Sequence, residues 1–275
     1  MRQNRILNII TLMRPQSVGL MLLFIYFPIL IKVGDWVYAL LQIVPIYLLI
    51  TGEVILNDYF DIEKDKINKG HRPLAAGKVS KHIAKRLIII LLTAAVISAF
   101  IIYEQSASRI VLFVVVFAML TIYSVWMNYI AAIKTFITAL VTVLCLGFIF
   151  SYIGFSQKIL YLMIVAFFYI SSRELLMDIR DYEGDKKYGC KTLAIRFGGK
   201  ATYFLALLFM LIAQVLYYNF FVIGSEGIGN VLWVVSLVIL IIAFPVFYVV
   251  NSKIQNIIAL ILWIPMMCVI PSVIL

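Results

Sequence analysis

Residues 57–65 read NDYFDIEKD and residues 178–185 read DIRDYEGD, in a chain of 275 residues that is otherwise very apolar. The two stretches hold eight of the 13 acidic residues, and each follows a long hydrophobic segment. Carboxylates gathered where apolar segments end need a specific reason, because charge is costly near a membrane interior. A common reason is a divalent metal ion that holds a phosphorylated substrate. We call these stretches the first and second acidic motifs.

The composition indicates a helical membrane protein. Hydrophobic residues make up 64% of the chain and its mean hydropathy is +1.08, far above soluble domains. Backbone polar groups in lipid must be satisfied internally, so long continuous apolar runs are helices, whereas β-barrel strands would be short and alternating. The pattern predicts an all-α, polytopic bundle of nine transmembrane helices, at residues 17–35, 37–57, 83–103, 107–127, 133–153, 157–178, 200–222, 229–250 and 254–274.

We expect residues 1–275 to form a single transmembrane domain. The two motifs end the second and the sixth predicted spans, which suggests two related four-helix halves followed by a ninth helix. The long connections 58–82 and 179–199 each continue from a motif, and loops of this length are more often functional than idle. Both would lie over the mouth of a central cavity.

The distribution of positive charge predicts the orientation in the cell membrane. With the N-terminus in the cytoplasm, only Lys32, Arg109 and Lys158 of the 23 Lys and Arg residues would lie on the outer side. Lys and Arg concentrate in cytoplasmic loops. Both acidic motifs are therefore expected at the cytoplasmic mouth of the cavity, and nine spans would leave the C-terminus outside.

Several chemistries are excluded by the same pattern. The formal net charge of +10 does not indicate a nucleic-acid binder, because the basic residues lie between predicted spans, where anionic headgroups attract them. Cys145, Cys190 and Cys268 are far apart and form no CxxC or Cys/His pattern. A zinc site or a disulfide framework is therefore not expected.

The spacing within each motif suits a metal site. Asn57, Asp61 and Asp65 are four residues apart and would share one face of a helix. A similar row begins at Glu174, just before the second motif, and continues through Asp178, Asp181 and Asp185. Oxygen ligands without Cys or His favour Mg²⁺, which binds one or two carboxylates and completes its shell with water and phosphate. We expect more than one Mg²⁺, bridging a diphosphate. The expected metal ligands are Asn57, Asp58, Asp61, Asp65, Asp178, Asp181 and Asp185, and the catalytic residues among them Asp61, Asp178 and Asp181.

A diphosphate also needs cations, and the basic residues beside the motifs are candidates. An Arg can hold phosphate through two parallel hydrogen bonds. Arg14 and Arg72 have the strongest claims, because each precedes a proline that fixes its direction. Lys69 and Lys187, in the two long connections, are further candidates.

Glu53 is one helical turn deeper in the second span than Asn57. A charged side chain there costs roughly 3 kcal/mol unless it faces a cavity. Glu53 is therefore expected either to line the site or to be satisfied by local hydrogen bonds. Tyr59 and Tyr123 lie near the motifs and are candidates for lining a prenyl or acceptor cavity, where aromatic faces stabilise an allylic cation.

Together these residues resemble the UbiA superfamily of intramembrane prenyltransferases. The resemblance covers nearly the whole chain. It implies transfer of a prenyl group from a prenyl diphosphate to an acceptor, with Mg²⁺, in a central cavity that opens laterally to the lipid. The second motif is most similar to that of archaeal geranylgeranylglycerol-phosphate geranylgeranyltransferases. The residues that carry the resemblance are Asn57-Asp58-x-x-Asp61-x-x-x-Asp65, Arg72-Pro73 with Gly77, and Asp178-x-x-Asp181-x-x-x-Asp185.

One position departs from the pattern of this superfamily. Many members carry a Tyr and, a few residues later, a Lys that helps to bind diphosphate at the end of the fourth span. Tyr123 is present here, but the Lys position corresponds to Asn128. Lys134, at the start of the next span, is the replacement candidate for binding the diphosphate, and Asn128 is expected to line the cavity.

The motifs leave the acceptor open. We expect a glycerol-phosphate lipid or a quinone-type aromatic acceptor, with membrane lipid as a partner and no nucleic acid. The run Arg72-Pro73-Leu74-Ala75-Ala76-Gly77 is also close to the loop of enzymes that transfer phosphoribosyl to decaprenyl phosphate, so that reaction is an alternative. A terpene cyclase and a carboxylate-based transporter are less favoured. A transporter would carry charges or broken helices near mid-membrane, whereas these acids gather at one face.

The predicted orientation can be tested by labelling. Single cysteines introduced as Lys69→Cys or Lys187→Cys should react with an impermeant maleimide only when the cytoplasmic side is exposed, because both positions lie in the long basic connections. Labelling from outside intact cells would overturn the orientation.

Overall fold

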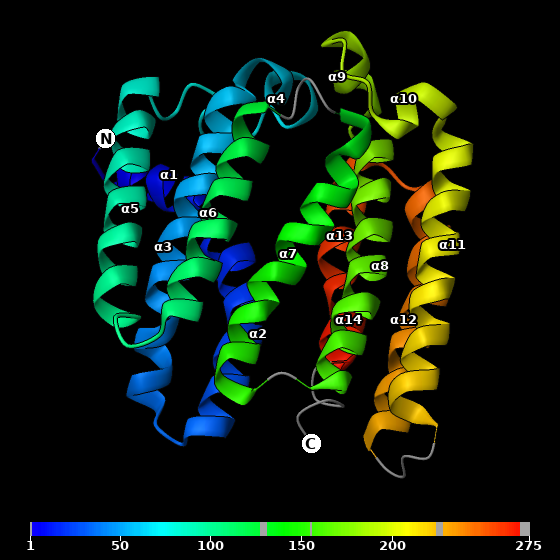
Figure 1. Ribbon diagram of the computed structural model, residues 1–275. Helices are drawn as coiled ribbons and strands as arrows, with labels where there is room; N and C mark the ends of the chain where they lie inside the picture. The colour runs from blue at the N-terminus through cyan, green and yellow to red at the C-terminus, as the bar shows by residue number, and fades with distance from the viewer. Residues whose placement is uncertain (1, 127–130, 155, 224–227, 270–275) are drawn as a thin grey trace. The chain divides into compact units, whose positions relative to one another are not determined.

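The computed structural model describes residues 2–126, 131–154, 156–223 and 228–269, which are helical apart from turns and short connections (Figure 1). The predicted all-α class is thereby confirmed for this part of the chain. The segments are α1 (Arg2–Met13), α2 (Pro15–Val33), α3 (Trp36–Phe60), α4 (Ile62–Asn68), α5 (Lys81–Ile102), α6 (Ala107–Trp126), α7 (Ala131–Ile153), α8 (Gln157–Arg180), α9 (Tyr182–Lys187), α10 (Leu193–Phe197), α11 (Gly199–Tyr217), the π-helical turn η1 (Tyr218–Val222), α12 (Ile228–Val249), α13 (Ser252–Ile261) and α14 (Trp263–Val269).

Each predicted span corresponds to one helix or to two consecutive helical segments. Three of the nine predicted spans, 17–35, 133–153 and 254–274, correspond to α2, α7 and the pair α13–α14, and residues 270–274 of the last span lie outside the described residues. The number of nine transmembrane helices therefore stays a prediction. Six described helices are long and apolar enough to cross a membrane, judged by length and composition: Trp36–Phe60, Lys81–Ile102, Ala107–Trp126, Gln157–Arg180, Gly199–Val222 and Gly229–Val249.

The chain divides into two compact units. The helix α7 contributes to both, and the end of the second acidic motif belongs to the first unit although the rest of that motif belongs to the second. The prediction of a single domain made of two four-helix halves stays a prediction. The first unit is Met1–Ile130, Gly147–Ile153 and Glu183–Cys190, and the second is Ala131–Leu146, Gly154–Tyr182 and Lys191–Leu275.

An apolar cluster holds the first acidic motif in place within the first unit. Ile55, just before the motif, and Ile62, within it, are buried together with Leu12 of α1 and with Leu74 and Val79 of the connection before α5. Burying each such side chain contributes about 1.5–3 kcal/mol. The motif is therefore fixed by a core to which α1, α3, α4 and the long connection all contribute.

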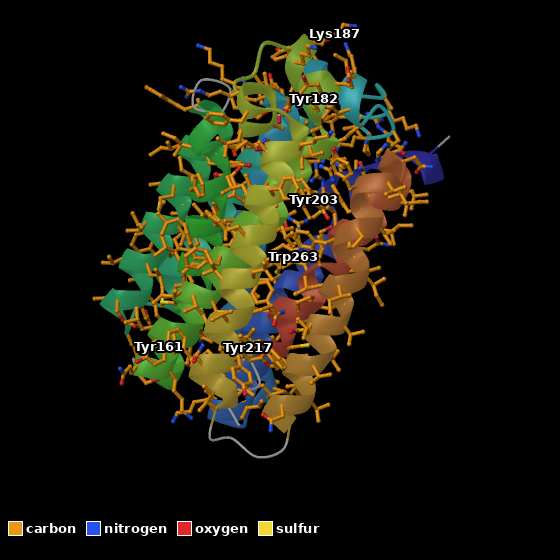
Figure 2. All side chains as sticks on the ribbon, turned by 90° about the vertical axis from the view of Figure 1, so that its right-hand side faces the viewer. Tyr161, Tyr182, Lys187, Tyr203, Tyr217 and Trp263 are labelled. Carbon is orange, nitrogen blue, oxygen red and sulfur yellow. The ribbon has the colours of Figure 1, made fainter. Side chains whose placement is uncertain are left out.

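Buried hydrogen bonds join the helices of the second unit. The Gln214 amide of α11 donates to the Tyr169 hydroxyl of α8 at 2.5 Å and to Ser236 Oγ of α12 at 3.0 Å. The hydroxyl of Tyr217, labelled in Figure 2, donates to the carbonyl of Cys268 at 2.8 Å. Ser172 Oγ of α8 donates to a carbonyl of α11 at 2.6 Å. Such bonds between apolar helices fix α8, which carries the start of the second motif, against its neighbours.

Candidate metal and diphosphate site

The first acidic motif spans a break between two helices. The helix α3 ends at Phe60, and Asp61, with φ −92° and ψ 10°, separates it from α4. The backbone hydrogen bonds nevertheless continue, from the Asp61 amide to the Asn57 carbonyl at 2.9 Å and from the Asp65 amide to the Asp61 carbonyl at 2.7 Å. The helical hydrogen-bond pattern therefore continues through the junction. Asn57, Asp61 and Asp65, which are four residues apart, are connected by these two consecutive backbone hydrogen bonds.

Two arginines bind the buried carboxylates of this motif. Asp58 is 2% exposed and Asp65 is 1% exposed. Arg72 Nη1 lies 2.8 Å from Asp58 Oδ1 and 2.5 Å from Asp65 Oδ2, so a single guanidinium bridges both acids. Arg14 also forms an ion pair with Asp58. The arginines proposed from sequence as diphosphate ligands are thus brought to the predicted metal ligands.

Arg14 is held in an unusual backbone conformation. Its φ of 48° lies in the left-handed region, and no other non-glycine residue in the described ranges has a positive φ. This conformation turns the chain between α1 and α2 immediately before Pro15. It costs roughly 1–2 kcal/mol for a residue with a Cβ, so the neighbouring packing must enforce it. Burial lowers the pKa of the Arg14 guanidinium, and the neighbouring Asp58 opposes that change.

Lysines of α4 and the following turn bind Asp61 and, in addition to Arg72, Asp65. Lys64 Nζ lies 2.9 Å from Asp61 Oδ2, and Lys69 Nζ lies 3.8 Å from Asp65 Oδ1. Glu63 points elsewhere, because it forms an exposed pair with Lys66 at 2.9 Å. The hydrogen bonds from Lys66 hold the pKa of Glu63 below its ordinary value. Glu63 thus lies away from the cluster around Asp58 and Asp65.

The residues of the first motif fit a hard cation. Asp58 Oδ2 and Asp65 Oδ1 are buried and accept no hydrogen bond from the described residues. Buried carboxylate oxygens normally have partners, and Mg²⁺ is the kind of partner that such oxygens bind. The described residues contain no group of three or more Asp, Glu, His or Cys side chains placed to hold a metal ion. Arg72 lies between the Asp58 and Asp65 carboxylates, which accounts for the separation of these two acids.

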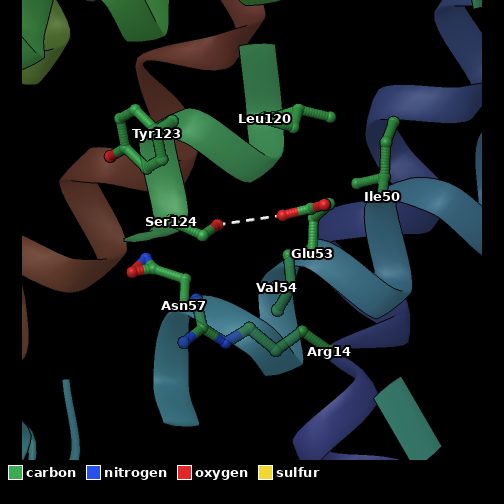
Figure 3. Close-up of a pocket in the computed structure, with 8 residues that line it drawn as sticks. All are labelled: Arg14, Ile50, Glu53, Val54, Asn57, Leu120, Tyr123 and Ser124. Carbon is green, nitrogen blue, oxygen red and sulfur yellow. Dashed lines mark hydrogen bonds between the residues drawn. The ribbon is translucent and has the colours of Figure 1, made fainter. Parts of the chain in front are cut away.

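A small pocket lies one turn deeper in α3. Its cavity volume is about 110 Å³. Figure 3 shows Glu53 and Ser124 facing each other across it, with Asn57 and Arg14 on one side. Glu53 is 3% exposed, lines this pocket, and accepts hydrogen bonds from Thr121 Oγ1 and Ser124 Oγ. The lining residues are Arg14, Ile50, Glu53, Val54, Asn57, Leu120, Tyr123 and Ser124.

The other residues proposed for the cavity or the diphosphate lie in different places. Tyr59 packs against the apolar cluster around Ile55 and meets the ring of Phe60 edge-on. Asn128 lies outside the described residues. Lys134 is in α7 within the second unit, and Lys187 ends α9 within the first. Their proposed roles stay predictions.

The second motif has the same backbone layout as the first. The helix α8 ends at Arg180, and Asp181 separates it from the short α9. Asp178 is buried and accepts a hydrogen bond from Thr135 Oγ1 at 3.2 Å. Asp181 binds the guanidinium of Arg180 through both carboxylate oxygens, at 2.8 and 2.9 Å. Asp185 is buried in the first unit.

Asn68 connects the end of the second motif to α4 within the first unit. The amide of Gly184 donates to Asn68 Oδ1 at 2.9 Å. A Cβ at position 184 would overlap the Asn68 side chain, so only glycine permits this approach. Asp185, the last predicted ligand of the second motif, therefore belongs to the same compact unit as Asp58 and Asp65.

A family model described as the UbiA prenyltransferase family matches residues 17–268, which is most of the chain. The chain belongs to the UbiA prenyltransferase family. The family predicted from the two acidic motifs is thus confirmed, and with it the assignment to a class of prenyltransferase enzymes. Together with the six apolar helices, membership of this membrane family makes the chain an integral membrane protein.

Two curated relatives carry the same name. Digeranylgeranylglyceryl phosphate synthase of Sulfolobus acidocaldarius is 32% identical over 170 residues, covering 60% of this chain and 60% of that protein, less than two thirds of its length. The synthase of Methanosphaera stadtmanae is 32% identical over 211 residues, covering 73% of this chain and 71% of that protein. These relatives support the predicted relation of the chain to archaeal enzymes of this type.

A solved structure has the same fold. It is a UbiA homolog from Archaeoglobus fulgidus bound to GPP and Mg²⁺, with a TM-score of 0.72 and 17% identity, and the match covers 97% of this chain and 99% of that chain. At this identity the likeness is one of fold alone.

Four residues of the site were not indicated by the UbiA motifs or by the sequence pattern. Lys64 pairs with Asp61, and Asn68 binds Gly184. Thr121 and Ser124 of α6 bind Glu53. Of these four residues, only Thr121 and Ser124 could have been proposed from the sequence, because two hydroxyl residues three positions apart share one face of an otherwise apolar helix.

The contact between Asn68 and Gly184 predicts a specific steric effect. Gly184→Ala should lower the stability of the detergent-solubilised protein by about 1–3 kcal/mol, because the new methyl group overlaps Asn68. Thermal unfolding measures this. Gly199→Ala is the matched control, since its Cβ would meet nothing within 4 Å, and it should change little.

The same contact can be isolated by a double-mutant cycle. In an Asn68→Ala background the overlapping side chain is gone, so Gly184→Ala should then have much less effect. An equal loss of stability in both backgrounds would show that Asn68 is not the group against which position 184 packs.

Proposed function

We propose that the chain is a Mg²⁺-dependent prenyltransferase that moves a prenyl group from a prenyl diphosphate to a glycerol-phosphate acceptor. The observation that carries this proposal is the pair of buried carboxylate oxygens on Asp58 and Asp65, which sit beside two arginines and lack hydrogen bonds from the described residues. Carboxylates for a metal and guanidinium groups for phosphate are the two halves of a diphosphate site.

The acceptor is proposed from the relatives. Both carry the name digeranylgeranylglyceryl phosphate synthase. The chain shares with them the family and 32% identity over the aligned regions. This favours a glycerol-phosphate acceptor over a quinone-type aromatic. No contact of the described residues favours phosphoribosyl transfer, cyclisation or transport as a second function.

The first motif is proposed to hold the leaving group. Asn57, Asp58, Asp61 and Asp65 are the proposed metal ligands of the first unit, and the Archaeoglobus homolog binds both GPP and Mg²⁺. Bound Mg²⁺ would neutralise the charge that develops on the departing diphosphate. Asp178, Asp181 and Asp185 are assigned the same task because they repeat the spacing of the first motif.

The arginines are proposed to exchange partners when substrate binds. Arg72 bridges Asp58 and Asp65, so its guanidinium is held beside the carboxylates that would bind the cation. Once the carboxylates hold a cation, Arg72 and Arg14 are available to bind the phosphate oxygens. Their planar donors suit this, since Arg binds phosphate as readily as carboxylate.

The bond changes are then those of an alkyl transfer. The bond between C1 of the prenyl group and the diphosphate oxygen breaks, and the diphosphate leaves with the electron pair. The acceptor hydroxyl oxygen forms a new bond to C1 and gives up its proton. A cytoplasmic N-terminus and cytoplasmic motifs are part of this proposal, because soluble diphosphate groups would then reach the site directly.

The function is tested with purified protein. Incubation with prenyl diphosphates of several lengths and with glycerol-phosphate and aromatic acceptors should yield a prenylated glycerol-phosphate product by mass spectrometry, and EDTA should abolish its formation until Mg²⁺ is added in excess. Full turnover in EDTA would exclude the metal role. Wild-type protein that prenylates only aromatic acceptors, or none, would overturn the proposed acceptor.

The two motifs can be tested by substitution. Asp61→Ala and Asp178→Ala should each lower turnover by ~100-fold or more while leaving the amount of folded protein almost unchanged. Glu63→Ala and Glu183→Ala are the controls, since both side chains are exposed, and they should be much milder. A near-normal rate in either aspartate variant would assign that motif to the scaffold rather than to the site.

A further inference from the structure

Glu53 is a buried acid that the metal and diphosphate sites do not use. It is 3% exposed and lies in the apolar helix α3, one turn before Asn57. A carboxyl group at this depth is costly, roughly 3 kcal/mol for an unsatisfied charge. A residue with that cost is retained where it performs a task, and in membrane helices such residues line substrate paths.

Two hydroxyl groups of α6 orient the Glu53 side chain. Thr121 Oγ1 donates to Oε1 at 2.7 Å, and Ser124 Oγ donates to Oε2 at 2.9 Å. Each carboxylate oxygen thus receives one hydrogen bond. A carboxylate has about four lone-pair directions, so two remain for other partners. Figure 3 shows the carboxyl group of Glu53 extending from α3 towards Ser124 within the pocket.

The pocket around Glu53 is lined by apolar side chains on one part and by polar side chains on another. Ile50, Val54 and Leu120 supply apolar surface, whereas Arg14 and Asn57 lie towards the first acidic motif. Its volume is about 110 Å³. Apolar surface, a carboxylate and a guanidinium line one small pocket, which suits a small aliphatic group that carries hydroxyls.

We propose that Glu53 binds the acceptor hydroxyl that attacks the prenyl group and takes its proton. This inference rests on the proposed function and assigns the acceptor subsite within it. The O–H bond of the acceptor breaks and its proton passes to a Glu53 oxygen, while the acceptor oxygen bonds to C1 and the bond from C1 to the diphosphate breaks. Thr121 and Ser124 are positioning residues, because they act only by holding the Glu53 carboxylate.

The pocket also explains where the acceptor phosphate would bind. Arg14 lines the same pocket as Glu53 and forms an ion pair with Asp58 of the metal site. Arg14 would then take the acceptor phosphate, and Arg72, which does not line this pocket, would keep the diphosphate. An acceptor with a hydroxyl at one end and a phosphate a few bonds away presents its hydroxyl to Glu53 and its phosphate to Arg14. A glycerol phosphate has this arrangement, whereas a hydrocarbon alcohol without phosphate lacks the second group.

The test separates proton transfer from packing. Glu53→Gln keeps the shape of the side chain and one acceptor oxygen but removes the base, so kcat for transfer to glycerol-phosphate acceptors should fall by ~100-fold or more. The KM for the prenyl diphosphate, and its binding with Mg²⁺ in the absence of acceptor, should stay within about twofold of wild type, because the metal site is untouched.

Thr51→Val is the matched control. Thr51 is also fully buried in α3, two residues before Glu53, and its hydroxyl has no hydrogen-bond partner among the described residues. Its replacement should leave kcat unchanged. Should Glu53→Gln fail to fold, Ser124→Ala provides the second test, because it leaves the acid in place but frees one oxygen. It should lower kcat by ~10-fold without changing prenyl diphosphate binding.

The outcomes distinguish this inference from the function on which it rests. Wild-type protein that prenylates no glycerol-phosphate acceptor overturns both. Wild-type transfer together with a Glu53→Gln rate within about threefold of it overturns the role of Glu53 alone. An effect confined to the KM for the acceptor, with kcat unchanged, also overturns it, since that would make Glu53 a binding residue and not the base.

Discussion

The bridge that Arg72 makes between Asp58 and Asp65 is the interaction on which the first acidic site depends. Both acids are almost completely buried, and a buried charge is tolerated only when a partner is close. The Nη1 atom of Arg72 lies within 2.8 Å of both carboxylates. Removing one member of such a cluster leaves an uncompensated charge and costs about 3–5 kcal/mol.

That constraint explains the fold around the motif. Arg72 reaches the acids only because the connection after α4 turns back, and Leu74 and Val79 of this connection are buried against Ile55 and Ile62. The apolar contacts stabilise the folded connection, and the ion pairs orient the Arg72 side chain towards Asp58 and Asp65. An ionic cluster adds little net stability to a packed core, but it specifies one arrangement of the loop over the helix end.

The sequence predicted the features that depend on residues close together in the chain. Span positions follow from the length of apolar runs, and the predicted span 37–57 corresponds to α3, Trp36–Phe60. The extra residues at its end are 58–60, and the charged Asp58 ends the apolar run, so hydropathy could not include them. The break at Asp61 was also not foreseen, because its neighbours are compatible with a continuous helix and the backbone hydrogen bonds pass through it.

Contacts between distant residues were beyond the sequence pattern. Glu53 was expected either to line a cavity or to be locally hydrogen-bonded, and it does both, but its partners Thr121 and Ser124 are 68 and 71 positions away. Asn68 and Gly184 are 116 positions apart. Such pairings are set by helix packing, and a single sequence carries no record of which helices pack together.

The two motifs share a backbone layout of a long helix, an aspartate at the junction and a short helix. In the second motif Asp181 binds Arg180, its neighbour in the chain. In the first motif Asp58 binds Arg14 and Arg72, which come from two segments outside α3. The first motif and these two arginines belong to one compact unit. The groups proposed to bind phosphate therefore already contact a carboxylate proposed to bind the metal, which is the arrangement that the proposed exchange of partners requires.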